Sequence, residues 1–97
     1  MSVFVGDVGV TVKYTITSGP ANTGATLLQF QVRKPDGSLV NWPALNLASD
    51  TSGKTLYYDT IAGDFDQPGD YRIIPYREFG DSSKHHCDPV FLTVLPA

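Results

Sequence analysis

Cysteine is nearly absent from this sequence, and that scarcity limits how the chain can be held together. Cys87 is the only cysteine among 97 residues, so no internal disulfide can form. The opening residues, MSVFVGD, contain neither the basic segment nor the apolar stretch of a secretion signal. We therefore expect a chain made in a cytoplasm and stabilised by its core.

Long apolar runs and clusters of positive charge are lacking as well. The longest apolar run is a few residues, whereas crossing a bilayer takes about 20. The net charge is −3, and positive residues never exceed two in a row, at Arg33 and Lys34. Proteins that bind nucleic acid usually carry a basic stripe. We expect neither a membrane-spanning segment nor a nucleic-acid partner.

The apolar content is sufficient for a folded core. Apolar residues make up 41% of the chain, and a protein of this size buries roughly 60–68% of its unfolded surface. We expect a single domain over residues 1–97.

The clearest local pattern lies at 26–42. Leu28, Phe30 and Val32 alternate with polar residues, which is the period of a strand with one buried face. The sequence KPDG then provides the residues that a tight turn needs, before an extended segment resumes. This stretch predicts a β-hairpin, which needs further strands to cover its apolar face.

Short extended segments with turn signals every 8–12 residues continue through the rest of the chain. Strands are expected at 3–5, 10–17, 55–61, 70–79 and 90–95, with an uncertain piece at 44–54 and a polar loop at 80–89. The last strand is apolar on both faces, which predicts a place between two layers. No helical period is present. We predict an all-β fold, an immunoglobulin-like antiparallel β-sandwich of about seven strands.

Two residues near the 70–79 strand carry specific expectations. Tyr71 follows a corner, at Pro68-Gly69-Asp70, where sandwiches often lock the turn with a tyrosine hydroxyl. The alternative is an ordinary core tyrosine. Pro75 cannot donate a ladder hydrogen bond, so it suggests an edge position, a bulge or a break.

The run His85-His86-Cys87-Asp88 contains three residue types that bind metals. A zinc site needs three or four converging ligands, whereas neighbouring strand residues point to opposite faces, so at most two of these could share an ion. A polar loop leading into the last strand is the better interpretation. Cys87 lacks an orienting motif for a nucleophile and is better explained as a small buried hydrophobe.

The carboxylates of the sequence do not form a recognisable calcium-binding or catalytic motif. Asp64, Asp66 and Asp70 bracket a turn, but the spacing lacks the calcium-loop pattern, and turn aspartates that bond their own backbone are commoner. Glu78 is the only glutamate, and no phosphate loop, dinucleotide or nucleophile-elbow motif is present. We expect no catalytic residues, no metal, no cofactor and no enzymatic activity.

Aromatic residues are the candidates for binding. Tyr57, Trp42, Tyr76 and Phe79 would serve as interface anchors or sugar platforms if they lie on an outer face. Core positions are the alternative, favoured for Trp42 and Tyr58. Tyr57 is the best candidate for an exposed contact.

Several motifs together resemble a known family. The matching segments are the opening FVGDVGVTVKYTIT, the segment from GAT through VRKPDG to a tryptophan, the DQPGDY turn and the closing DPVFLTV. Through these segments the chain resembles small tailed-phage virion domains, notably the amino-terminal domain of phage baseplate upper proteins. The resemblance implies a non-enzymatic virion protein, mounted in symmetric multiple copies on tail, baseplate or fibre proteins. Within the same virion hypothesis, the alternative to a tail or baseplate position is a capsid decoration protein. A small carbohydrate-binding module is the alternative from a different functional class.

Overall fold

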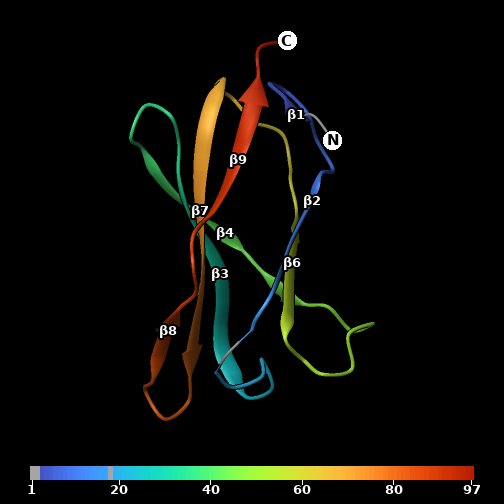
Figure 1. Ribbon diagram of the computed structural model, residues 1–97, viewed down its shortest axis with the longest axis vertical. Helices are drawn as coiled ribbons and strands as arrows, with labels where there is room; N and C mark the ends of the chain where they lie inside the picture. The colour runs from blue at the N-terminus through green and yellow to red at the C-terminus, as the bar shows by residue number, and fades with distance from the viewer. Residues whose placement is uncertain (1–2, 18) are drawn as a thin grey trace.

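The chain forms two β-sheets stacked face to face (Figure 1). The computed structural model describes residues 3–17 and 19–97. Met1, Ser2 and Ser18 lie outside it, and with them the first residues of the segment considered for a secretion signal. No helix is found in the described part, so no helix there is long and apolar enough to cross a membrane. The predicted all-β, immunoglobulin-like sandwich is confirmed.

Within residues 3–17 and 19–97, nine strands make up the two sheets, and several of them are only two or three residues long. In chain order they are β1 (Val3–Phe4), β2 (Thr11–Thr15), β3 (Ala25–Arg33), β4 (Leu39–Pro43), β5 (Leu45–Asn46), β6 (Thr55–Asp59), β7 (Gly69–Phe79), β8 (Lys84–His86) and β9 (Val90–Leu95).

The larger sheet has the order β1-β9-β7-β3-β4, with β8 paired to the end of β7 that β9 leaves free. The smaller sheet has the order β2-β6-β5. All pairings are antiparallel except that of β1 with β9. The chain crosses between layers at Pro43 and Ala44, where β4 ends and β5 begins almost at once.

The hairpin of β3 and β4 forms as the sequence predicts. Phe30 pairs with Trp42 and Val32 with Val40, so their side chains share the inner face. In the turn, the Asp36 carboxylate accepts hydrogen bonds from the amide of Ser38 at 2.9 Å and from its hydroxyl at 2.7 Å. Gly37 takes the positive φ, 88°, that the turn requires.

Pro75 lies in β7, which is central in the larger sheet and not at its edge. The strand tolerates proline there because its neighbour changes at this point. β9 pairs with β7 as far as Ile73, and β8 begins to pair at Tyr76. The missing N–H therefore coincides with a break in the neighbouring ladder.

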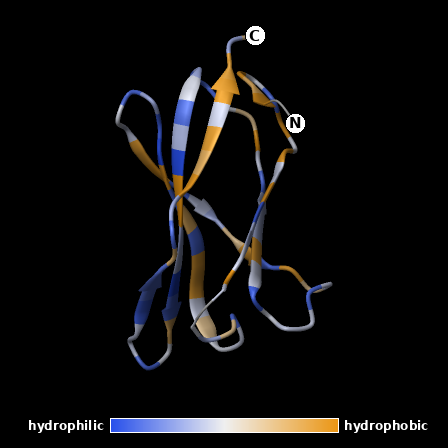
Figure 2. Ribbon diagram, in the orientation of Figure 1, coloured by the Kyte–Doolittle hydropathy of each residue, from blue (hydrophilic) through white to orange (hydrophobic). Residues whose placement is uncertain are grey.

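Two expectations about the carboxyl-terminal part are corrected. The segment 80–89 is not all loop, because β8 forms within it by pairing with β7. Strand β9 is not buried on both faces, because Phe91 points outward and is 68% exposed. Figure 2 shows the contrast between β8, which is mostly hydrophilic, and β9, which is mostly hydrophobic.

Aromatic rings form the centre of the core. Trp42 stacks on Tyr58 with ring centroids 5.2 Å apart and meets Phe65 edge-on at 5.6 Å. Phe65 in turn meets Tyr71 at 5.5 Å. The Tyr71 hydroxyl bonds the backbone of Gln67, which confirms the predicted tyrosine corner. These contacts link the two layers through the corner before β7.

Candidate functional site

The predicted interface aromatics do not gather on one surface. Trp42 and Tyr76 are only 2% and 6% exposed, so neither ring offers contact surface in this structure. Tyr57 and Phe79 are half-buried. Tyr57 lies opposite Lys13 on the outer face of the smaller sheet, and its role as a contact stays a prediction.

The three turn aspartates are engaged separately. Asp64 accepts hydrogen bonds from the Tyr58 hydroxyl at 2.6 Å and from the amide of Ile61 at 2.7 Å. Asp66 forms an ion pair with Lys34 at 2.9 Å, and Asp70 accepts a hydrogen bond from Thr93 at 2.7 Å. The structure does not bring their carboxylates together as a calcium site would.

The two histidines point to opposite faces of β8. His86 packs on Tyr76 with ring centroids 4.5 Å apart, and His85 meets Phe79 edge-on at 5.5 Å. Only His85 and Cys87, two residues apart, share the inner face. Among the residues that the structure describes, no group of three histidine, cysteine or acidic side chains is placed to hold a metal ion.

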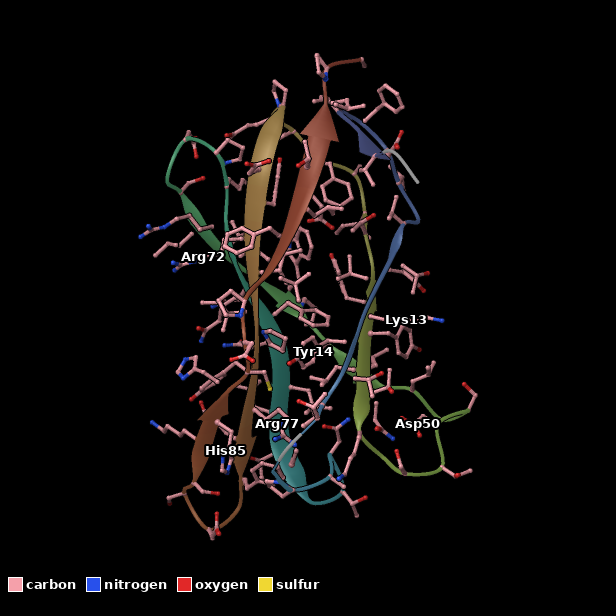
Figure 3. All side chains as sticks on the ribbon, in the orientation of Figure 1. Lys13, Tyr14, Asp50, Arg72, Arg77 and His85 are labelled. Atoms are coloured by element: carbon pink, nitrogen blue, oxygen red, sulfur yellow. The ribbon has the colours of Figure 1, made fainter. Side chains whose placement is uncertain are left out.

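A cavity of about 180 Å³ lies between the carboxyl-terminal end of β2 and the segment 85–88. Four groups of residues line it: Tyr14 at the end of β2, the following loop with Ile16, Thr17 and Gly19, Arg77 of β7, and all four residues of the segment 85–88. Figure 3 shows Arg77 and His85 at the end of the sandwich where β8 lies. The segment that leads from β2 in the smaller sheet to β3 in the larger sheet borders the cavity through Ile16, Thr17 and Gly19.

Arg77 is the residue that distinguishes this cavity. Its side chain is 1% exposed, and one of its terminal nitrogens donates to the carbonyl of Pro20. The guanidinium carbon lies 5.3 Å from the centre of the Phe79 ring. The Nε atom, however, is buried without a hydrogen-bond partner among the described residues.

No described carboxylate neutralises Arg77. The ion pair found in residues 3–17 and 19–97 joins Lys34 to Asp66 and leaves Arg77 out, and the remaining three residues carry no acidic side chain. An arginine stays protonated in proteins, and burying an unpaired charge costs several kcal/mol. The structure therefore holds a buried cation without a described ion-pair partner at the wall of a cavity that Asp88 also borders.

The loop after β2 is fixed against Arg77. Gly19 has a φ of +94°, and a Cβ there would lie 3.4 Å from the Nη2 atom of Arg77. Further along, buried Asn22 donates to the side chain of Asn46 at 3.0 Å and to the carbonyl of Thr55 at 3.2 Å. This anchoring holds the loop as a defined wall of the cavity.

Tyr14 and Cys87 supply neutral hydrogen-bond donors to the cavity, whereas Asp88 adds a carboxylate to its wall. Burial raises the pKa of the Cys87 thiol, and the charge and hydrogen bond of nearby Arg77 offset this only in part. Burial, with the nearby Cys87 and Asp88, also raises the pKa of the Tyr14 hydroxyl. Both groups are therefore protonated at neutral pH and suited to face an anion.

The sequence carried a signal for Arg77 that the motif search missed. Tyr71 and Ile73 point inward, and the period of two along β7 continues through Pro75 to residue 77. An arginine in phase with core residues is unusual, since arginine is almost never fully buried unless it is paired. The alternation of inward-pointing residues along β7 therefore predicts that Arg77 points into the core.

Comparison with known proteins adds one solved structure. No protein-family model matches the chain, and no curated protein is similar to it in sequence. The crystal structure of CopC from Methylosinus trichosporium OB3b superposes with a TM-score of 0.60, covering 98% of this chain and 84% of that one. The chain is similar in fold to CopC. With 18% identity, the likeness shows the fold alone.

This match contradicts the resemblance to phage baseplate upper proteins. CopC is a bacterial periplasmic copper-binding protein. The virion role, its capsid-decoration variant, the phage partners in multiple copies and the virion location are corrected together. The carbohydrate-binding alternative is corrected as well, and the rings of Trp42 and Tyr76 are buried. The motifs misled because KPDG and PGDY are turn sequences that many β-sandwiches share.

CopC shares this fold, so we compared the described residues with the requirements of a metal site. A site with three histidine, cysteine or acidic ligands does not fit the described residues. His85, His86, Cys87 and Asp88 all border the cavity, and within this segment His85 and Cys87 share one face.

Proposed function

We propose that this chain is a non-enzymatic binding protein whose cavity between β2 and β8 holds a carboxylate on Arg77. The observation that carries the proposal is the guanidinium of Arg77, which is 1% exposed and has no acidic partner among residues 3–17 and 19–97. A carboxylate matches a guanidinium in geometry and charge, and it would neutralise the buried cation.

The size of the cavity favours a small group over a whole ligand. Pockets for drug-sized molecules measure about 300–1,000 Å³, whereas this one holds about 180 Å³. The Tyr14 hydroxyl and the His85 ring lie on its walls beside Arg77 and can donate further hydrogen bonds. An acidic side chain or a chain terminus fits these limits.

The absence of catalysis is part of the same proposal. CopC-like copper-binding proteins are non-enzymatic. In this chain, the raised pKa of Cys87 keeps its thiol protonated at neutral pH, whereas the thiolate is the reactive form. These observations support a site that binds and does not react.

A titration with acetate tests the proposal. Two-dimensional NMR should show saturable shifts at Arg77, Gly19 and His85, and the substitution Arg77→Met should abolish them. Arg72→Met is the matched control, because Arg72 lies on the outer face of the same strand and is only half-buried. Acetate shifts that are absent, or that survive Arg77→Met in the folded protein, would refute the proposal.

Copper binding is a second candidate, favoured by the fold likeness to CopC together with the placement of His85 and Cys87. Thiolate is a soft ligand that selects Cu(I), and imidazole also suits copper. We expect Cu(I), added anaerobically in competition with a chromophoric chelator, to bind in a way that Cys87→Ser and His85→Ala abolish. His86→Ala is the comparison, because its ring packs on Tyr76 on the face opposite to His85, although the residue also borders the cavity. Equal binding by all three variants would exclude this site.

A further inference from the structure

We propose that the free edge of β2 receives an extended segment of a partner protein, and that an acidic side chain of this segment enters the cavity at Arg77. The inference rests on the proposed carboxylate site and names what would deliver the carboxylate. It follows from three features of one side of the sandwich: an unpaired strand edge, a second cavity and the distribution of charge.

Strand β2 ends the smaller sheet with one side unpaired. Its only strand neighbour in the described part of the chain is β6 (Figure 1). Constant-type immunoglobulin domains place a fourth strand at this position, whereas here β1 pairs with β9 in the other sheet. The place of one strand is therefore open.

The hydrogen-bond pattern shows which groups the edge offers. Val10 accepts from the amide of Thr60 at 3.0 Å, and the amide of Ile16 donates to Lys54 at 2.8 Å. Because antiparallel ladders alternate, the even-numbered residues of β2 bond β6 and the odd-numbered ones point the other way. The amides and carbonyls of Thr11, Lys13 and Thr15 are thus directed toward the open position.

A second cavity lies at the other end of the same edge. It measures about 190 Å³ and is lined chiefly by apolar side chains, among them Val10 and Val12 of the β2 side and Val90 and Leu92 of β9. An added strand would therefore meet an apolar cavity near Val12 and the Arg77 cavity near Ile16. Alternate side chains of such a strand would fill pockets while its backbone extends the sheet.

The distance between the cavities sets the spacing in the partner. Val12 and Ile16 are four residues apart, or about 13 Å along a strand. Residues separated by four positions also point to the same face. The partner segment should carry a carboxylate and a large apolar side chain four residues apart.

Charge favours a foreign acidic segment over a second copy of this chain. Lys13 stands at the middle of the edge, with its side chain pointing away from the sandwich (Figure 3). Two β2 edges paired symmetrically would place like charges opposite each other, which is destabilising. A lysine on an edge also opposes indiscriminate pairing. A carboxylate-bearing segment complements both Lys13 and Arg77, and Asp88 at the wall of the same cavity acts against it in part.

The test uses the full chain and the acetylated, amidated peptide Thr-Asp-Thr-Val-Thr-Leu-Thr, which has the required spacing. Binding should protect the amides of Thr11, Lys13 and Thr15 from hydrogen exchange. Replacing the peptide aspartate by asparagine, or Arg77 by methionine, should weaken binding at least about tenfold, since charge-assisted bonds are the stronger ones.

A pair of proline variants isolates the edge. Lys13→Pro removes an amide that faces the open position and should abolish peptide binding while leaving acetate binding intact. Asn41→Pro is the control, because β4 ends the larger sheet and the amide of Asn41 also faces away from its neighbour. This variant should bind the peptide normally.

The outcomes separate the two proposals. The docking inference is overturned, and the carboxylate site stands, if acetate binds but the peptide does not. The same conclusion follows if acetate binds and the peptide binds Lys13→Pro as well as it binds the parent protein. If acetate fails to bind and the asparagine peptide binds as well as the aspartate one, the carboxylate site is overturned and the inference resting on it falls too.

Discussion

The Nη2 atom of Arg77 lies 3.4 Å from the point that a Cβ of residue 19 would occupy, and Gly19 has a φ of +94°. The glycine therefore satisfies two demands at once, a left-handed backbone and a close approach to a buried cation. Gly24 shares only the first, with a φ of +84° and nothing within 4 Å of its Cβ position.

Comparing Gly19 with Gly24 separates the effect of the left-handed backbone from the effect of the close approach to Arg77. Gly19→Ala and Gly24→Ala should each lower the free energy of unfolding by about 1–2 kcal/mol, because L-residues are strained at positive φ. Only Gly19→Ala should change acetate binding, since only its methyl group would contact Arg77, at 3.4 Å. Urea denaturation and the acetate titration check the two effects. Equal acetate affinity in both variants would show that position 19 does not shape the cavity.

The tyrosine corner should be a measurable source of stability. The hydroxyl of Tyr71 donates to the carbonyl of Gln67 and accepts from its amide, each at 3.1 Å. Tyr71→Phe leaves both backbone groups without this partner and should lower the free energy of unfolding by about 1–3 kcal/mol. Tyr57→Phe serves as the comparison in urea denaturation, because no described residue bonds that hydroxyl. Similar losses in the two variants would argue against the corner.

Acid should destabilise the fold through three turn aspartates. Hydrogen bonds from Ser38, Ser52 and Ser83 lower the pKa values of Asp36, Asp50 and Asp81, respectively. A carboxyl whose pKa is lower in the folded state stabilises the fold above its unfolded pKa, and this contribution disappears as the pH falls through the folded value.

The melting temperature should therefore decrease between about pH 5 and pH 2, the range in which such carboxyls titrate. The triple variant Asp36→Asn, Asp50→Asn, Asp81→Asn should have a lower melting temperature at pH 6 and a flatter dependence on pH. Thermal unfolding followed by circular dichroism measures both. Parallel curves for the variant and the parent protein would contradict the assignment.

The thiol of Cys87 should react slowly. Burial raises its pKa, while Arg77 acts in the opposite direction, and the thiolate is the reacting species. At pH 7, Ellman's reagent should modify the folded protein more slowly than the urea-unfolded chain. Arg77→Met should slow the reaction further, whereas Arg72→Met should not. A faster reaction in Arg77→Met would show that the charge of Arg77 does not act on the thiol.

Much of the fold was predictable because alternation along single strands reports which face is buried. Leu28, Phe30 and Val32 revealed β3, and the turn residues after Lys34 fixed the hairpin. The place of Pro75 was not predictable in this way, because it depends on where two other strands meet β7. Nor was β8, whose polar residues form a strand only because β7 offers an unpaired edge.

The candidate site was less accessible from sequence than the fold. The segment 85–88 drew attention as a metal motif, and the structure instead makes it one wall of a cavity whose decisive residue is Arg77. That residue depends on β2, the following loop and β7 converging from distant parts of the chain. Motif matching, by contrast, favoured the turn sequences that are shared by unrelated sandwiches.

The direct passage from β4 to β5 at Pro43 and Ala44 gives the molecule a mechanical asymmetry. The amide of Ala44 donates to the carbonyl of Leu28 at 3.0 Å, so covalent chain and sheet hydrogen bonds hold the layers together along that flank. On the opposite flank, no backbone hydrogen bond joins β2 to the larger sheet among the described residues. When thermal motion separates the two layers, Pro43 and Ala44 should therefore act as the hinge. Solvent should then reach the interior first past Val10 and Val12.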